Sequence, residues 1–247
     1  MSPLVTALVL GAALLHASWN AIIKSSRDVM LDTALVAAGA SILSLPMIVA
    51  MPMPSSGSWP FLAASVVIHV AYFATLARAY RVGDLGHAYP LMRGTAPLLV
   101  ALFGIALLDE RPSANMWLGI VLISAGILSI GLLQKGRAHR DATLWALMNA
   151  VIIAGYTLVD GSGVRLSGTA AGYVAWMFLL QGLIFIALVG VLRRHSALHY
   201  IGDHWRRGLA GGLFLFVSYG IVLWAMTRAP VAAVAALRET SVIFAAM

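Results

Sequence analysis

Two arginines lie within stretches of sequence that are otherwise apolar, Arg93 in the segment 86–108 and Arg238 in the segment 231–247. A charge inside a bilayer costs about 2.5–3.5 kcal/mol on insertion scales, so a membrane sequence retains it for a partner or a function. Two guanidinium groups beside one cavity would attract an anionic or zwitterionic substrate and could hold a carboxylate or phosphonate through paired hydrogen bonds. The alternative is structural, with each arginine paired to a carboxylate or to carbonyls at a helix end.

Two carboxylates in similar surroundings are candidate proton carriers. Asp160 stands in TLVDGSGVR, where it is alternatively the partner of an arginine, or a wet helix-end residue before glycines that break the helix. Glu239 adjoins Arg238, but neighbouring residues of a helix point about 100° apart. We therefore expect Glu239 to be a second cavity group or a proton carrier, and not a direct partner of Arg238. Asp109 and Glu110 lie in a turn and should be solvated.

Polar and aromatic side chains inside the apolar runs are candidates for the lining of a substrate cavity. Tyr89 is four residues before Arg93 and therefore shares its helix face. Asn20 and Asn149 would face hydrocarbon unless they lie inside the protein. The alternative for the tyrosines and the tryptophan of this set is a place at the membrane interface, where aromatic rings with polar tips also gather. Besides the two arginines, the candidate substrate-binding residues are Trp19, Asn20, Tyr72, Tyr89, Asn149 and Tyr219.

Two prolines, Pro90 and Pro97, flank Arg93. Each removes a backbone donor and bends a helix, so the pair is either a hinge for a conformational change or a static kink. His16 is a lone histidine in the first apolar run, and for it we favour a hydrogen-bonded helix contact over a proton relay.

Other chemistries lack their residues in this sequence. There is no cysteine, which excludes disulfides and thiolate nucleophiles. The histidines of the basic loops are not spaced as zinc ligands, and no GxxxxGK[ST] motif is present for ATP. We therefore predict no catalytic residue, no metal site and no cofactor.

The elements that position these residues are membrane helices. Of the 247 residues, 61% are hydrophobic and 10% are charged, with a mean hydropathy of +0.93, whereas soluble domains carry about 25% charged residues. The chain contains apolar runs of about 20 residues, which is the length of a membrane-spanning helix. The predicted fold class is therefore an all-α polytopic membrane protein. The first run has no basic flank before it and is expected to be a retained helix. The nine predicted segments are 4–23, 31–51, 60–80, 86–108, 114–133, 143–162, 170–192, 207–227 and 231–247.

The basic residues predict the orientation. The loops after the first, third, fifth and seventh segments hold eleven Lys and Arg, and the alternate loops hold three. This excess should face the cytoplasm and place the N-terminus outside, so the net charge of +7 does not indicate nucleic-acid binding. Arginine strongly outnumbers lysine, which favours a GC-rich bacterial genome and hence a bacterial inner membrane. Gly208 and Gly212 form a small-xxx-small pair that should allow close helix packing.

Similar residues recur in the two halves of the chain. An offset of five helices inverts the topology of the second half, and inverted repeats are typical of secondary transporters with a midplane site between the halves. We expect a five-helix repeat at 1–135 and an incomplete four-helix repeat at 142–247, because the last apolar run has no stop signal. The matched pairs are Asn20 with Asn149, Tyr72 with Tyr219, Arg81 with Arg228, Arg93 with Arg238 and Thr95 with Thr240.

Three stretches resemble the ten-helix EamA-type members of the drug/metabolite transporter superfamily. They are HASWNAIIK, then AYPLMRGTAPLLVALFGIALLDERPSANMWLGIVLISAGILSIG, and finally ALRETSVIFAAM. The expected tenth helix and most of the second acidic turn are absent. The resemblance implies a secondary transporter of small metabolites that works by alternating access, commonly as an exporter driven by protons or by substrate exchange. It does not imply an enzyme.

Two other functions stay open at this stage. An intramembrane enzyme for lipid or polyprenyl substrates would need a polar cluster at one membrane face, and the sequence shows none. A non-transporting membrane partner or sensor is retained because the chain is expected to be truncated. The expected partners are the lipid bilayer, a small-molecule metabolite and a coupling proton, with a homodimer left open and nucleic acid excluded.

Overall fold

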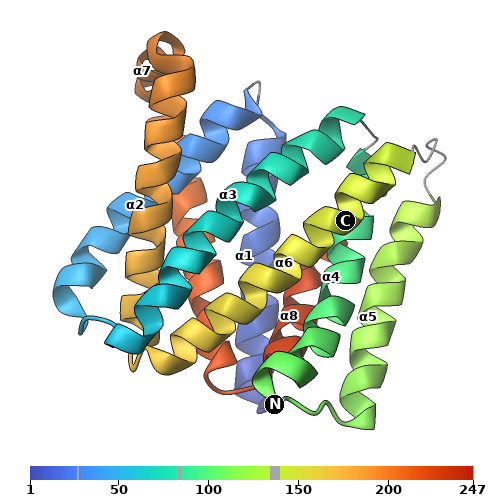
Figure 1. Ribbon diagram of the computed structural model, residues 1–247. Coiled ribbons are helices and arrows are strands. Elements are labelled where there is room, and N and C mark those ends of the chain that lie inside the picture. Colours follow the sequence, from blue (N-terminus) through green and yellow to red (C-terminus); the bar gives the residue numbers. More distant parts are fainter. Residues whose placement is uncertain (27, 83–84, 134–139, 247) are drawn as a thin grey trace.

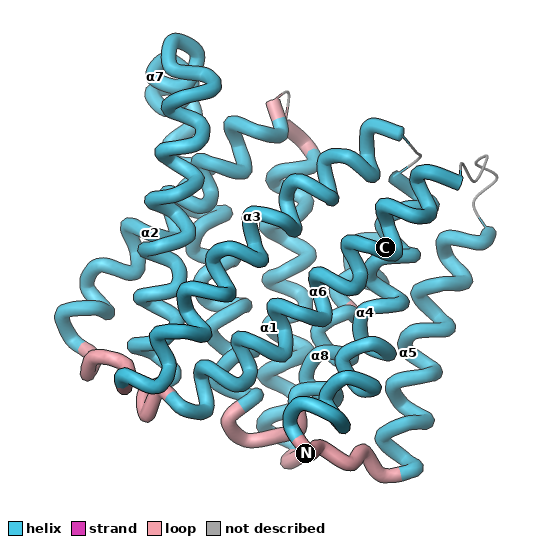
Figure 2. Tube along the Cα trace, in the orientation of Figure 1, coloured by secondary structure: helices cyan, strands magenta, loops and turns pink. Residues whose placement is uncertain are grey.

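The computed structural model describes residues 1–26, 28–82, 85–133 and 140–246, and within these ranges the chain forms helices and short loops without a strand (Figures 1 and 2). Eight helical spans in the described residues are long and apolar enough to cross a membrane, and two of them lie within one helix, α7. The predicted all-α polytopic fold is thus confirmed. The helices are α1 (Pro3–Lys24), α2 (Val29–Ala50), α3 (Trp59–Val82), α4 (Leu85–Leu108), α5 (Ala114–Leu133), α6 (Arg140–Leu166), α7 (Ala170–Met226), α8 (Val231–Glu239) and α9 (Ser241–Ala246).

The helix α7 contains two of the predicted segments. Its spans Ala170–Val191 and Tyr200–Met226 correspond to the seventh and eighth apolar runs. Figure 1 shows the helix (orange) rising above the rest of the bundle, turning there and running back down.

The ninth predicted segment is not one continuous helix. It is divided at Thr240 into α8 and α9, and neither piece is long enough to span a bilayer. The Thr240 hydroxyl donates to the carbonyl of Leu237 at 2.6 Å, a local bond that competes with helix propagation. The break places Arg238 and Glu239 at the end of a short helix inside the bundle, where both are buried.

The connections sort onto two ends of the bundle. The α1–α2 connection, the ends of α3 and α5 and the turn of α7 lie at the upper end of Figure 1, opposite the N-terminus. These are the places where the sequence concentrates basic residues, although Arg27 and the segment 134–139 lie outside the described residues. The assignment of this end to the cytoplasm stays a prediction.

Glycines bring α2 and α7 into close contact. A Cβ added to Gly212 would lie 2.5 Å from the backbone nitrogen of Ala40, and one added to Gly39 would lie 2.4 Å from the carbonyl oxygen of Gly208. No side chain fits at such distances. The close packing predicted for Gly208 and Gly212 is therefore confirmed, and α2 is the partner.

An acidic residue holds the beginning of α8. Glu110 accepts bonds from Arg165 Nη2 at 2.6 Å and from the backbone nitrogen of Val231 at 3.0 Å. Arg165 also donates to the carbonyls of Met226 and Ala229. Glu110 is thus a partly buried clamp, contrary to the expected solvated turn, because the positive end of α8 and an arginine both need an acceptor there.

We predict that Gly212→Ala destabilises the protein, because a methyl group in this contact meets backbone and forces α2 and α7 apart. Overpacking of this kind costs about 1–3 kcal/mol. The thermal midpoint of the purified protein in detergent should fall by several degrees.

The matched control is Gly190→Ala on the same helix, where an added Cβ meets nothing within 4 Å. This change should leave the midpoint unchanged or raise it, since alanine is the better helix former. Equal midpoints for the two variants would contradict the packing.

Candidate functional site

The two buried arginines converge on one carboxylate. Arg93 Nη1 of α4 lies 3.2 Å from Glu239 Oε2 and 3.3 Å from Oε1. Arg238 of α8 donates to Oε1 from Nη2 at 2.7 Å and from Nε at 3.1 Å. The side chains of Arg93, Arg238 and Glu239 are 3%, 3% and 1% exposed, so all three lie inside the protein.

The contact between Arg238 and Glu239 corrects an expectation. Neighbours on a helix point apart, but α8 ends at Glu239 and a turn begins at Thr240. The long arginine side chain nevertheless reaches the carboxylate of its neighbour. Glu239 is therefore a direct partner of both arginines.

This cluster carries a surplus positive charge, because two guanidinium groups face one carboxylate among the described residues. The Tyr89 ring lies 5.5 Å from the Arg93 guanidinium, and the Tyr156 ring lies 5.8 Å from that of Arg238. Cation–π contacts stabilise the guanidinium groups without changing their charge. The surplus positive charge makes the cluster a favourable place for an anion.

A second buried polar group surrounds Asp160 in α6. The hydroxyl of Tyr219 donates to its Oδ2 at 2.5 Å, and that of Tyr173 donates to its Oδ1 at 3.4 Å. Asp160 is 0% exposed, and α6 continues to Leu166. The interpretation as a wet helix end is therefore wrong, since the following glycines pack against α7 and α8 instead of breaking the helix.

Aromatic rings connect the two polar groups. His69 of α3 lies against Tyr156, with ring centroids 4.3 Å apart, and edge-on to Tyr219 at 6.4 Å. Tyr156 in turn lies under Arg238. His69 was not among the predicted residues, although the argument applied to Arg93, a polar group inside an apolar run, would also have selected it.

A cavity of about 80 Å³ lies beside these rings. Ligand pockets usually measure about 300–1,000 Å³, so this cavity is much smaller than a typical ligand pocket. Of the predicted binding residues, Trp19, Tyr72, Arg93 and Tyr219 line the cavity, together with His16, His69 and Tyr156. Tyr89, Arg238 and Glu239 contact Arg93 or each other but do not line it.

The two matched asparagines make other contacts. Asn20 Nδ2 donates to the carbonyl of His16 on its own helix at 2.8 Å. Asn149 Nδ2 joins α6 to α3 by donating to the Tyr72 carbonyl at 2.9 Å and to Thr75 Oγ1 at 2.7 Å. Neither lines the cavity, so a role for them in substrate binding stays a prediction.

The two prolines lie within a continuous helix. The helix α4 extends from Leu85 to Leu108 through both Pro90 and Pro97. Its path is compatible with either a static bend or a hinge, and the hinge stays a prediction.

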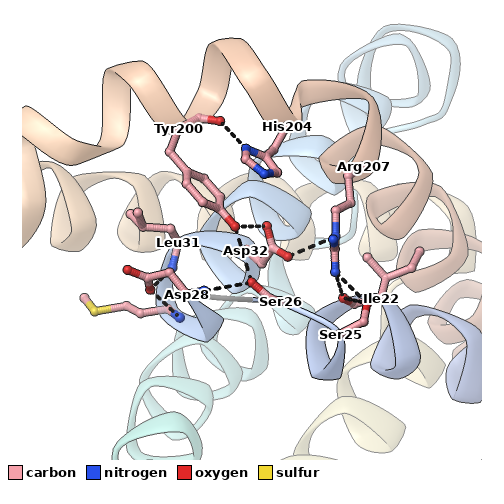
Figure 3. A network of polar contacts seen from close by, with 10 residues as sticks. Ile22, Ser25, Ser26, Asp28, Leu31, Asp32, Tyr200, His204 and Arg207 are labelled. Carbon is pink, nitrogen blue, oxygen red and sulfur yellow. Dashed lines mark hydrogen bonds and ion pairs between the residues drawn. The ribbon is translucent and has the colours of Figure 1, made fainter.

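A polar network joins the α1–α2 connection to α7, and Figure 3 shows it from close by. Asp32 of α2, whose side chain is 1% exposed, lies 3.0 Å from Arg207 Nε and accepts a bond from the Tyr200 hydroxyl at 2.8 Å. Arg207 also donates to the carbonyl of Ile22 and, at 2.7 Å, to the hydroxyl of Ser25. Asp32 thus ties the start of α2 to the second span of α7, and Arg207 of that span also holds the end of α1.

This network lies beside the cavity. Ile23 and Thr33, which line the cavity, are the chain neighbours of Ile22 and Asp32 in the network. Asp32 was not among the predicted residues, although a carboxylate at the start of the apolar run 31–51 is a visible signal.

Comparisons with known proteins identify the family and the fold. A model of the EamA-like transporter family matches residues 4–132. An uncharacterized transporter encoded in a cobO 3' region of Sinorhizobium sp is 35% identical over 71 residues, which are 29% of this chain and 50% of that relative. The match to that relative thus spans half of its length.

One solved crystal structure shares the fold. It matches with a TM-score of 0.72 at 19% sequence identity, over 98% of this chain and 84% of the other. The family model covers slightly more than half of the 247 residues, and this multi-pass membrane protein therefore belongs to the EamA-like transporter family.

Proposed function

We propose that the protein is a secondary active transporter that carries small anionic or zwitterionic metabolites across the bacterial inner membrane by alternating access. The observation that carries this proposal is the surplus positive charge of Arg93 and Arg238 around Glu239, beside an aromatic cavity. Buried charge of this kind is expensive in a membrane and marks substrate pathways. Export is the direction we propose, on the basis of the resemblance described above.

In this proposal Arg93 is the anchor for the substrate. It is the arginine of the pair that lines the cavity, whereas Arg238 does not line it and makes the shorter contact with Glu239. The planar guanidinium can present two donors to a carboxylate or phosphonate. Tyr72, Tyr156 and Tyr219 supply walls with polar tips for the body of the substrate.

Asp160 is the proposed proton-coupling residue. It is fully buried, its two oxygens accept bonds from tyrosine hydroxyls, and Tyr219 connects it to the cavity. Buried carboxylates in transporters commonly serve as proton relays. Glu239 is the second candidate, because it is equally buried and contacts the anchoring arginine.

The alternating-access motion is proposed to be a rocking of the halves 1–135 and 142–247, with Pro90 and Pro97 as hinges. The network around Asp32 is the gate at one end, since a path from the cavity past Ile23 and Thr33 requires α1 and α2 to leave α7. The small cavity corresponds to a state that must open before a metabolite enters.

We predict that Arg93→Leu abolishes anion binding in a folded protein. Wild type in nanodiscs should be stabilised against heat by acetate, benzoate or phenylphosphonate, and the variant should not, because the charge that attracts the anion is gone. Thermal midpoints with and without each anion measure this.

The matched control is Arg228→Leu, which removes an exposed arginine that lies against Trp224, away from the cavity. It should respond to anions as wild type does. Equal stabilisation of the wild type and the Arg93 variant would show that this arginine is structural and would overturn the proposed site.

The gate leads to a separate prediction. The sequence has no cysteine, so Ala37→Cys introduces a single thiol into the cavity wall. A membrane-impermeant maleimide added at the end of the basic loops should label this thiol at least about tenfold faster when Asp32→Asn is also present. Hydrogen bonds to a charged group contribute about 1.5–3 kcal/mol each, and weakening them populates the open state.

The control for this experiment is Asp109→Asn in the same cysteine background. Asp109 is an exposed carboxylate paired with Arg111 at 3.5 Å, so its loss should leave the labelling rate unchanged. If Asp32→Asn leaves the labelling rate unchanged, the Asp32 network is not the gate.

A further inference from the structure

One wall of the cavity is a row of three side chains, Trp19 and His16 of α1 and Arg93 of α4. Trp19 Nε1 lies 3.3 Å from His16 Nδ1, and Arg93 Nη2 lies 3.0 Å from His16 Nε2. His16 is 7% exposed and Arg93 is 3% exposed. All three residues line the cavity.

The row contains more donors than acceptors. An indole nitrogen and a guanidinium nitrogen can donate but cannot accept a hydrogen bond. A neutral imidazole has one accepting nitrogen, and the other carries a proton. In either tautomer one donor, from Trp19 or from Arg93, therefore faces an N–H of His16 in place of an acceptor. A doubly protonated ring would leave both donors unsatisfied and would add a third positive charge to the cluster.

A donor inside the protein that lacks an acceptor is costly, so this wall needs one acceptor more than the contacts of the described residues supply. A neutral acceptor would satisfy the hydrogen bond and leave the surplus charge of Arg93 and Arg238 around Glu239 in place. An anionic oxygen meets both requirements at once. Carboxylate and phosphonate oxygens each offer several lone pairs and can accept from two donors together.

We propose that an anionic oxygen of the substrate binds between Arg93 Nη2 and Trp19 Nε1, and that the His16 ring occupies this position only while the substrate is absent. This inference rests on the proposed transport function and specifies its binding site. The ring leaves when the substrate enters, and the indole N–H then donates to the substrate. The substrate is thus a carboxylate- or phosphonate-bearing molecule, and its body meets the aromatic walls that include Phe73, Phe178 and Phe185.

Benzoate is the probe for this site, and benzamide is its uncharged counterpart of nearly equal shape. Protein labelled with ¹⁵N at the indole nitrogens is titrated with each in detergent micelles, and the Trp19 signal is assigned from its absence in Trp19→Phe. Benzoate should shift the indole N–H signal of Trp19, and benzamide should not.

Variants test the same site through affinity. Trp19→Phe keeps the ring and removes the N–H, so benzoate affinity should fall about tenfold. His16→Ala removes the competitor for the site, so benzoate affinity should rise, about three- to tenfold. Trp224→Phe, on a ring outside this cavity, is the matched control and should bind benzoate as wild type does.

The outcomes separate the two proposals. Benzoate stabilisation that depends on Arg93 but leaves the Trp19 signal and the Trp19→Phe affinity unchanged overturns the site described here and keeps the proposed function. A lower benzoate affinity in folded His16→Ala shows that His16 binds the substrate itself and overturns its role as a placeholder. If the alanine variant does not fold, the labelled wild type still decides through the Trp19 signal. Absence of any response to the anions overturns the proposed function.

Discussion

Two buried arginines need an acceptor inside a membrane, and the carboxylate of Glu239 supplies it to both. Removing an ion from water costs several kcal/mol even after relaxation, so the helices that carry these groups have to stay together. Arg93 comes from α4 and Glu239 from the end of α8. The start of α8 is held by another acceptor, Glu110, which contacts Arg165 and the Val231 nitrogen. Two ion pairs, one at each end of a nine-residue helix, thus determine where the second arginine lies.

The last apolar run is divided next to this cluster, since Arg238 and Glu239 are the last two residues of α8 and Thr240 follows them. Neighbouring side chains of a helix point about 100° apart. The contact between them therefore depends on the length of the arginine side chain, which donates from Nε and Nη2 to Glu239 Oε1. Both groups are thus buried against each other.

Sequence reasoning succeeded where a physical rule acts on single residues. A charge in hydrocarbon must lie inside the protein, and this rule selected Arg93, Arg238, Glu239 and Asp160, all of which are buried. The spacing of Gly208 and Gly212 likewise predicted a close helix contact. The rule could not predict features that depend on tertiary structure, such as the residue at which a helix ends. Periodicity could not reveal the end of α8.

Partners were also beyond the reach of sequence patterns. Asn149 was selected as a polar group, but its neighbours on α3 follow from how α6 packs. Glu110 looks like an ordinary turn residue until Arg165 and the start of α8 are placed beside it. His69 and Asp32 carried a visible signal, a polar side chain within or at the edge of an apolar run, and a uniform application of the rule would have included them.

The two buried polar groups have opposite charges, and this relation favours coupling in the proposed transport cycle. The arginine cluster holds one positive charge more than Glu239 offsets, and Asp160 is a second buried carboxylate, bonded to Tyr219, whose ring lies against His69. With both groups ionised, the interior is close to neutral. A bound anion offsets the arginines and leaves Asp160 as the unbalanced charge, and a proton on Asp160 restores neutrality. Binding of the anion and binding of the proton therefore favour each other electrostatically, because burying a net charge in a low-dielectric interior is the expensive step.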